Sequence, residues 1–300
     1  MTILANKTAG TVQRAGADDL QRRLREGLDK RGLDATVEML DGAQLMDRAR
    51  QLAGERDQTL VVGGGDGTIG AVAALLAGTD GILGVLPLGT LNHFSKDLGL
   101  PTDLEGALDV IAAGHVRTVD VAEVNGQVFV NNSSIGLYPF LVAERTAEQR
   151  RRGVGKLAAI LPALWRSLRA RAWHRVRIVA EDGKGRQHRT SLLFVGNNFY
   201  DLAALGKRAD LCAGELCVHV VKHRGWWRLA LLPFKIALLG ALGRTLDPGD
   251  IESLRVKALT IESRRRRLRV AIDGETVKLP TPLTYRTLPG HLRVLAPAPP

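Results

Sequence analysis

The stretch Thr59-Leu60-Val61-Val62-Gly63-Gly64-Gly65-Asp66-Gly67-Thr68 decides the fold class of this chain. Its apolar first half is typical of a buried strand, and the apolar, alanine-rich residues 68–77 have a helical period. Glycines between a strand and a helix let the backbone approach a ligand and aim N–H groups at it. Because the helix start adds the positive end of a dipole, this junction predicts an anion site suited to phosphate groups.

Two familiar phosphate loops do not account for this junction. Residues 65–70 fit the pattern G-x-G-x-x-G, but they follow the third expected strand rather than the first and contain an aspartate. The junction is not a Walker loop, since no Lys-Ser/Thr pair follows the glycines. A carboxylate would repel a bare pyrophosphate, yet it suits a site that handles Mg²⁺ or takes a proton from an attacking hydroxyl. Asp66 therefore indicates phosphoryl transfer.

The first third of the chain alternates between strand-like and helix-like patterns. Strands are expected at 2–5, 36–40, 59–62 and 82–86, and helices at 18–30, 44–53, 68–77 and 103–113. This alternation predicts a mostly parallel sheet flanked by helices, which is a three-layer α/β domain.

The pattern changes after Gly114. The pair Asn125-Gly126 between two apolar runs predicts a hairpin. Further strands are expected at 176–180, 190–195, 216–221, 254–261, 268–272 and 283–286. The sequence thus predicts an α/β nucleotide-binding domain over 1–118 and a mainly antiparallel, β-rich second domain over 119–300.

Composition and charge limit the class of partner. The chain has 42 Lys+Arg against 31 Asp+Glu, a net charge of +11, which favours an anionic partner. No aromatic-rich RNA platform or DNA-reading helix is evident, so we do not expect nucleic acid. No run reaches the roughly 20 apolar residues of a spanning helix, and the N-terminal apolar run is too short for a signal peptide. Cys212 and Cys217 are expected to pack in the core of a reduced, cytoplasmic protein.

A second glycine turn, Pro87-Leu88-Gly89-Thr90-Leu91-Asn92-His93-Phe94, follows the next expected strand. Together with Gly64-Gly65-Asp66-Gly67-Thr68, it resembles the signature of the diacylglycerol kinase catalytic-domain family, which includes bacterial lipid kinases and the sphingosine and ceramide kinases. The fold of that family is related to those of the NAD kinases and 6-phosphofructokinases. The resemblance covers essentially the whole chain and implies ATP and Mg²⁺ as cofactors.

The resemblance also implies where the nucleotide binds. Thr90 and Asn92 would donate to phosphate oxygens or the ribose, and the loop Asn6–Gly10 is similar to a nucleotide-holding loop of the family, with Lys7 in place of a proline. Asp66 is expected to act in catalysis and to bind the metal. Nucleotide contacts are expected from Asn6, Gly10, Gly64, Gly65, Gly67, Thr68, Gly89, Thr90 and Asn92.

Two stretches of the second domain match the family as well. Residues 131–136 resemble a segment that lies in the interdomain cleft of the family. Val270–Glu275 resembles an Asp-Gly-Glu element in which Glu275 would be the catalytic carboxylate, with Asp273 beside it. Taken alone, Asp-Gly is ordinary turn chemistry.

Two departures from the family pattern leave questions open. His93 stands where many members carry Asp, and it would act as a hydrogen-bonding or phosphate-binding group if it has a role. Ala213 stands where an Asp ligand of a structural metal would be, within Asp210–Glu215. A metal at that turn is therefore in doubt.

Basic helical insertions are expected near 156–172 and 226–243, where Arg and Trp accompany apolar residues. That composition is typical of a membrane interface, although an ordinary amphipathic helix packed on the sheet explains it equally well. The run Arg264-Arg265-Arg266-Arg267 is expected to be a solvated hairpin turn, with lipid or acidic partners as the alternative.

Taken together with this resemblance, the sequence predicts an ATP-dependent lipid kinase, cytoplasmic and peripherally attached to an anionic membrane; the resemblance implies diacylglycerol as the default substrate and an α/β nucleotide-binding domain followed by a lipid-substrate domain, with phosphatidic acid as the product. A kinase of a soluble substrate such as NAD remains an alternative, as does a non-catalytic nucleotide or nucleic-acid binder. The sequence leaves open which lipid is phosphorylated and whether the chain forms a homodimer.

Overall fold

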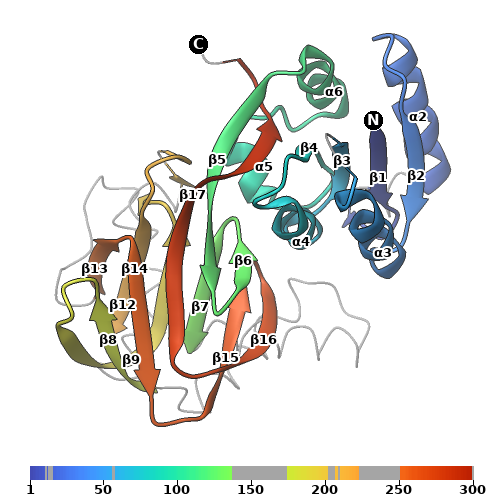
Figure 1. Cartoon of the computed structure of the whole chain (residues 1–300). Helices are drawn as coiled ribbons and strands as arrows, with labels where there is room; N and C mark the ends of the chain where they lie inside the picture. The colour runs from blue at the N-terminus through green and yellow to red at the C-terminus, as the bar shows by residue number, and fades with distance from the viewer. Residues whose placement is uncertain are drawn as a thin grey trace, which may run out of the picture. The chain divides into compact units, whose positions relative to one another are not determined.

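The computed structural model describes residues 1–10, 12, 16–55, 58–136, 174–201, 207–208, 210–222 and 251–298. The expected insertions near 156–172 and 226–243 lie outside the described residues. The chain divides into two compact units (Figure 1). The first comprises Met1–Val121, Val128–Asn131 and Leu288–Pro300, and the second comprises Ala122–Gln127 and Asn132–Thr287.

The first unit alternates strands and helices, as predicted. Its elements are β1 (Thr2–Asn6), α2 (Ala17–Asp29), β2 (Thr36–Leu40), α3 (Gly42–Ala53), β3 (Thr59–Gly64), α4 (Asp66–Leu76), β4 (Ile82–Pro87), α5 (His93–Asp97) and α6 (Leu104–Ala113). The strands pair in parallel in the order β2-β1-β3-β4, and the last residues of β17 (Leu283–Leu295) extend this sheet parallel to β4.

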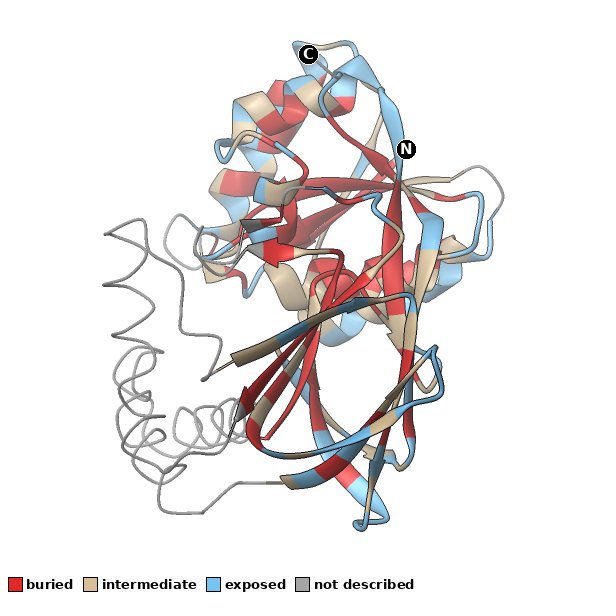
Figure 2. Ribbon diagram, turned by 90° about the vertical axis from the view of Figure 1, so that its left-hand side faces the viewer, coloured by how far each residue is buried: buried red, intermediate tan, exposed pale blue. Residues whose placement is uncertain are grey.

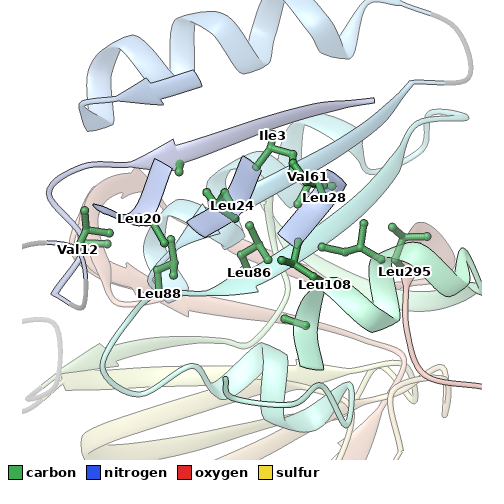
Figure 3. Close-up of a cluster of buried hydrophobic side chains, with 14 residues drawn as sticks. Ile3, Val12, Leu20, Leu24, Leu28, Val61, Leu86, Leu88, Leu108 and Leu295 are labelled. Carbon is green, nitrogen blue, oxygen red and sulfur yellow. The ribbon is translucent and has the colours of Figure 1, made fainter. Parts of the chain in front are cut away.

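Helices cover both faces of the parallel sheet. On one face, Leu20, Leu24 and Leu28 of α2 and residues of α6 pack on alternate strand residues such as Ile3 and Val61 (Figure 3). On the other face of the sheet, α3 and α4 pack against each other and against β3. The strand side chains on that face alternate along each strand with those of the first cluster. The predicted three-layer α/β domain is confirmed.

Local sequence signals explain where several helices begin. Asp41 caps α3 in a reciprocal capping box with Gln44, and the Asp103 side chain accepts a hydrogen bond from the Gly106 N–H at the start of α6. The helix α6 ends at Gly114, whose φ of 66° lies in the left-handed region that glycine adopts easily.

The second unit is antiparallel, as predicted. Two strands, β5 (Val116–Val124) and β6 (Gln127–Phe129), belong partly to the first unit and partly to the second. The other strands of the second unit are β7 (Asn132–Gly136), β8 (His174–Ala180), β9 (Gly185–Asn197), β10 (Tyr200–Asp201), β11 (Lys207–Arg208), β12 (Leu216–Lys222), β13 (Ile251–Val256), β14 (Ala258–Ser263), β15 (Arg267–Ile272), β16 (Glu275–Pro280) and the first half of β17. The main path is β16-β15-β7-β9-β8-β14-β17, with β12 and β13 paired beside β9.

Backbone conformation confirms the predicted hairpin at Asn125-Gly126, where both residues have positive φ. The Asn125 side chain holds this turn, because its Nδ2 donates to the carbonyl oxygens of Pro280 and Pro282. Figure 2 shows that buried residues run along the strands, with exposed residues concentrated at turns and outer faces.

Three expectations need correction. The strand expected at 254–261 is two strands, because Lys257 and Ala258 donate their N–H groups to Glu181 and the chain passes from a pairing with β12 to one with β8. The second domain does not keep all residues after 118, since Leu288–Pro300 return to the first unit through the pairing with β4. Cys217 is buried, but Cys212 is exposed. No helix among the described residues is long and apolar enough to cross a membrane.

Candidate active site

The carboxyl ends of β1, β3 and β4 meet at one edge of the parallel sheet, since these strands are neighbours. The strand β2 pairs with one side of β1, and the next strand in the chain, β3, pairs with the other side of β1. Open α/β sheets bind ligands in the crevice at such a switch in strand order. Both glycine turns of the sequence follow strands that end here.

The loop after β1 is joined to the start of α4 by side chains. Asn6 Nδ2 donates to Thr68 Oγ1 at 3.2 Å, and Asn6 Oδ1 accepts from the N–H and hydroxyl of Thr8. Because the Thr68 oxygen accepts from Asn6, its own hydroxyl hydrogen stays available for a ligand. A Cβ on Gly10 would lie 3.2 Å from Thr90 Oγ1, so the loops after β1 and β4 also approach each other.

The two glycine turns touch through their backbones. A Cβ on Gly89 would lie 2.5 Å from Gly65 Cα and 2.6 Å from Asn92 Oδ1, and a Cβ on Gly64 would lie 2.8 Å from Thr68 Cβ. Contacts of this kind leave no room for a side chain, which explains the glycines physically.

The helix α4 begins at this contact and exposes backbone donors there. Gly65 precedes the helix with no side-chain cap, and the first bond of the helix runs from Ile69 N–H to the Gly65 carbonyl. The N–H groups of the first turn, from Asp66 to Thr68, therefore have no partner within the helix. Together with the helix dipole they have the arrangement that binding of an anion requires.

Asp66 is the first residue of α4, not a residue of the preceding loop as its position among the glycines suggested. Its side chain is partly exposed, and Oδ1 accepts a hydrogen bond from the Phe94 N–H at 3.3 Å. This bond orients the carboxylate and leaves Oδ2 available. No sequence pattern predicted this role for Phe94, although a residue at a helix start, here two positions after Asn92, has an unpaired N–H group.

The donor set at this edge fits a magnesium ion that arrives with a nucleotide. Magnesium is commonly held by one or two carboxylates and completes its shell with phosphate oxygens and water. Asp66 supplies such a carboxylate beside the phosphate-binding N–H groups. Among the described residues there is no group of three or more His, Cys, Asp or Glu side chains that could hold a metal ion without ligands from a nucleotide or water.

Asn92 shapes the second glycine turn. It is buried, has a left-handed backbone with φ 51° and ψ 48°, and donates through Nδ2 to the carbonyls of Pro87 and Gly89, both at 3.1 Å. Its amide hydrogens are thus used within the turn, while Oδ1 is buried without a partner. Of the two side chains expected to donate to the nucleotide, Thr90 is exposed, whereas the Asn92 amide hydrogens serve its own turn.

His93 is exposed and opens the short helix α5, next to the Phe94 N–H that binds Asp66. All nine expected nucleotide-contacting residues lie in the first unit, around the contact between the two glycine turns.

The two remaining candidate carboxylates lie in the second unit, at the turn between β15 and β16. Asp273 has a φ of 45° and exchanges two hydrogen bonds with Asn132: its Oδ1 accepts from the Asn132 N–H at 3.0 Å, and its own N–H donates to the Asn132 carbonyl. Glu275 is exposed, and no partner of its carboxylate is found among the described residues. Asp273 therefore holds the hairpin to β7, whereas Glu275 is available for chemistry.

The turn that raised the question of a structural metal uses its acidic groups in other ways. Asp210 Oδ1 accepts from the Cys212 N–H at 2.8 Å, and Glu215 pairs with Arg255 at 3.4 Å.

The parallel sheet, two touching glycine turns and an oriented aspartate define an α/β nucleotide-binding protein equipped for phosphoryl transfer. The model of the diacylglycerol kinase catalytic domain matches residues 1–124. A "Probable lipid kinase YegS-like" of Pseudomonas aeruginosa is 32% identical over 308 residues, with 99% of this chain and 94% of the relative covered. The chain belongs to this family of YegS-like lipid kinases with a diacylglycerol kinase catalytic domain, as the resemblance predicted.

Other relatives agree. A "Probable lipid kinase YegS" of Escherichia fergusonii is 35% identical over 170 residues, which are 55% of each chain. A solved structure described as "A putative diacylglycerol kinase from Bacillus anthracis str. Sterne" superposes with a TM-score of 0.73 at 25% identity and covers 99% of this chain and 96% of that chain.

Proposed function

We propose that the protein transfers the γ-phosphoryl group of ATP to the hydroxyl of a lipid, with diacylglycerol as substrate and phosphatidic acid as product. The observation that carries the proposal is the Asp66 carboxylate, placed at the uncapped start of α4 and oriented by the Phe94 N–H. A carboxylate among phosphate-binding donors is unfavourable unless a metal or a proton-donating hydroxyl uses it.

The first unit binds the nucleotide in this proposal. The N–H groups at the start of α4 and the hydroxyls of Thr68 and Thr90 donate to the phosphate oxygens. Bound Mg²⁺ would neutralise charge on the phosphates, with Asp66 as its protein carboxylate. The touching glycines keep side chains out of this space, so that the phosphates can approach the backbone.

The transfer step needs a base for the lipid hydroxyl. The hydroxyl oxygen bonds to the γ-phosphorus, the bond to the β–γ bridging oxygen breaks, and ADP leaves. The hydroxyl proton passes to a carboxylate, for which Glu275 and Asp66 are the candidates. Glu275 is the better supported of the two, because its carboxylate is exposed and is not needed for the metal.

Diacylglycerol is proposed on the description of the matched family and on the name of the similar Bacillus anthracis structure. The test is a transfer assay with γ-labelled ATP and Mg²⁺, in which neutral mixed micelles carry diacylglycerol, monoacylglycerol, ceramide, sphingosine or phosphatidylglycerol, and NAD is supplied in solution. We expect label in phosphatidic acid above all other products. Preferential labelling of NAD would contradict lipid specificity, and no transfer to any acceptor would contradict the kinase assignment.

A further inference from the structure

The hairpin that carries Glu275 also has a strongly cationic face. In the pairing of β15 with β16, Arg269 lies opposite Lys278 and Arg267 lies opposite Pro280. Residues directly opposite each other in an antiparallel pair share one face of the sheet. The side chains of Arg267, Arg269 and Lys278 are exposed and therefore lie together on one outer face.

Three further arginines precede this face. Arg264, Arg265 and Arg266 form the exposed turn between β14 and β15. The turn is fixed through its backbone, because Thr281 donates its hydroxyl to the Arg265 carbonyl and its N–H to the Arg266 carbonyl. The guanidinium groups are thus presented from a rigid turn, and replacing them leaves these backbone bonds in place.

No acid neutralises this surface within the described part of the chain. The nearest acid in sequence, Glu262, pairs with Arg177 at 3.2 Å. None of Arg264–Arg267, Arg269 and Lys278 has an ion pair among the described residues. We call these residues the hairpin cation surface. Unpaired cations gathered on one hairpin and its adjoining turn attract a polyanion rather than stabilise the fold.

We infer that the hairpin cation surface docks onto the headgroups of an anionic lipid bilayer; this inference rests on the proposed function for its choice of partner. The lipid substrate resides in a bilayer, and its phosphorylation adds a negative headgroup to that surface. Each arginine or lysine close to an anionic membrane strengthens attachment about 5-fold. The reaction therefore increases the charge that the surface binds.

Docking through this surface leaves the candidate catalytic residue uncovered. Glu275 pairs with Ile272, and by strand alternation both side chains lie on the face opposite Arg267 and Arg269. Along the strand, Glu275 is about 20 Å from the arginine turn at roughly 3.3 Å per residue. Figure 1 shows β15 and β16 side by side, and β16 ends the strand order of the sheet. One edge hairpin thus combines a docking face with a reactive carboxylate.

Two Arg- and Trp-containing stretches of the sequence adjoin β8 and β12 along the chain. Residues 137–173 lead into β8, whose Val176 pairs with Ser263 just before the turn, and residues 223–250 follow β12, whose Lys222 pairs with Thr190 next to β8. Their composition is typical of an interfacial element. They lie outside the described residues, so the docking surface is assigned to the turn, β15 and β16 alone.

The test is cosedimentation of the full chain with sucrose-loaded vesicles of phosphatidylcholine, with and without 30 mol% phosphatidylglycerol, at about 0.1 M salt. One variant carries Arg264→Gln, Arg265→Gln and Arg266→Gln. A second carries Arg267→Gln, Arg269→Gln and Lys278→Gln. The control carries Arg23→Gln, Arg25→Gln and Lys30→Gln, which removes the same charge from exposed positions on and just after α2.

We expect wild type to bind anionic vesicles and not neutral ones. The turn variant should bind on the order of 100-fold more weakly, and the control should change less than about 3-fold. The strand variant should weaken likewise, and if it fails to fold because β16 is an edge strand, the turn variant still decides. Equal binding by wild type and turn variant, or an equal loss in the control, would overturn the inference. A duplex RNA that binds wild type more tightly than the vesicles, through the same arginines, would assign the surface to nucleic acid instead.

A kinase assay separates this inference from the proposed function. With a short-chain diacylglycerol dispersed in neutral micelles, the turn variant should phosphorylate at the wild-type rate, whereas in anionic vesicles its rate should fall. If no lipid is phosphorylated by wild type while vesicle binding still depends on the arginines, the proposed function fails and the docking surface stands.

Discussion

The backbone N–H of Phe94 donates to Oδ1 of Asp66 at 3.3 Å, a contact between residues that lie 28 positions apart. It joins the turn after β4 to the first turn of α4 and fixes one carboxylate oxygen at the proposed phosphate site. A backbone donor persists through most substitutions at position 94, so the orientation of Asp66 depends on the turn geometry. The other oxygen remains for metal or substrate.

Replacement of Asp66 by Asn should remove the negative charge of this side chain while leaving the structure unchanged. The amide oxygen of Asn can still accept from Phe94 N–H, so the fold should persist, whereas metal binding and proton acceptance are lost. We expect turnover of ATP with diacylglycerol micelles to fall about 10²- to 10³-fold. The thermal unfolding midpoint should stay within about 2 °C of wild type. Near-normal turnover in this variant would remove Asp66 from the site.

Replacement of Gly89 by Ala should disrupt the contact between the two glycine turns. The new Cβ would fall 2.5 Å from Gly65 Cα, where only backbone movement makes room. We expect a loss of about 1–3 kcal/mol in the free energy of unfolding and weaker ATP binding, measured by denaturation and calorimetry. Gly54→Ala is the control, because Gly54 has a helical backbone and an added Cβ would meet only the Gln51 carbonyl oxygen, at 3.6 Å, so that stability should change by less than about 0.5 kcal/mol. An unchanged ATP affinity in Gly89→Ala would argue against a nucleotide at this contact.

The two acids of the β15–β16 turn should behave differently. Glu275→Gln should lower turnover about 10²- to 10³-fold with stability unchanged, since its carboxylate is exposed and free for chemistry. Asp273→Asn should lose far less turnover, because Asn keeps the acceptor for the Asn132 N–H and tolerates the left-handed backbone.

Asp273→Ala completes this comparison. It should destabilise the protein by about 1–3 kcal/mol, because alanine neither accepts the hydrogen bond from the Asn132 N–H nor tolerates the left-handed backbone well. Turnover and chemical denaturation of all three variants are the measurements. A turnover loss in Asp273→Asn as large as that in Glu275→Gln would show that Asp273 acts in the chemistry as well.

A buried histidine should make stability depend on pH. His219 Nδ1 lies 2.8 Å from Ser253 Oγ and Nε2 lies 3.1 Å from Cys217 Sγ, and burial lowers the pKa of this ring. The folded state then takes up a proton less readily than the unfolded chain, whose histidine pKa is about 6.5. The stability is fully present above that value and declines as pH falls toward the lowered folded pKa.

The measurement is the unfolding midpoint of wild type and His219→Gln between pH 7.5 and pH 5. Gln cannot take up the proton, so the difference between the two midpoints should narrow as the solution becomes more acidic. A difference that stays constant over this range would show that His219 does not carry the effect.

Periodicity predicted the first unit well because its elements are local. The leucines of α2 and the capping residues of α3 and α6 specify helices within a few positions, and the glycine turns specify strand ends. Local signals could not predict the return of β17 to β4, because it depends on paired residues that lie more than 200 positions apart in the sequence, such as Val294 and Leu83. The division of 254–261 into two strands depends on Glu181 in the same way.

Sequence patterns proposed the candidate site residues, but they could not predict the contacts that these residues make. The glycine patterns identified Asp66 and the loop after β4, and the family resemblance added Asn6 and Glu275. That the Asn92 amide serves its own turn follows from its left-handed backbone, which no sequence pattern specified.

The most direct test of the account is single-turnover transfer from γ-labelled ATP to diacylglycerol, measured for wild type and Asp66→Asn at saturating ATP and Mg²⁺. The account predicts labelled phosphatidic acid from wild type, and about 10²- to 10³-fold slower appearance from a variant that unfolds at the wild-type temperature. Equal rates from the two proteins, or no labelled lipid from wild type, would contradict it.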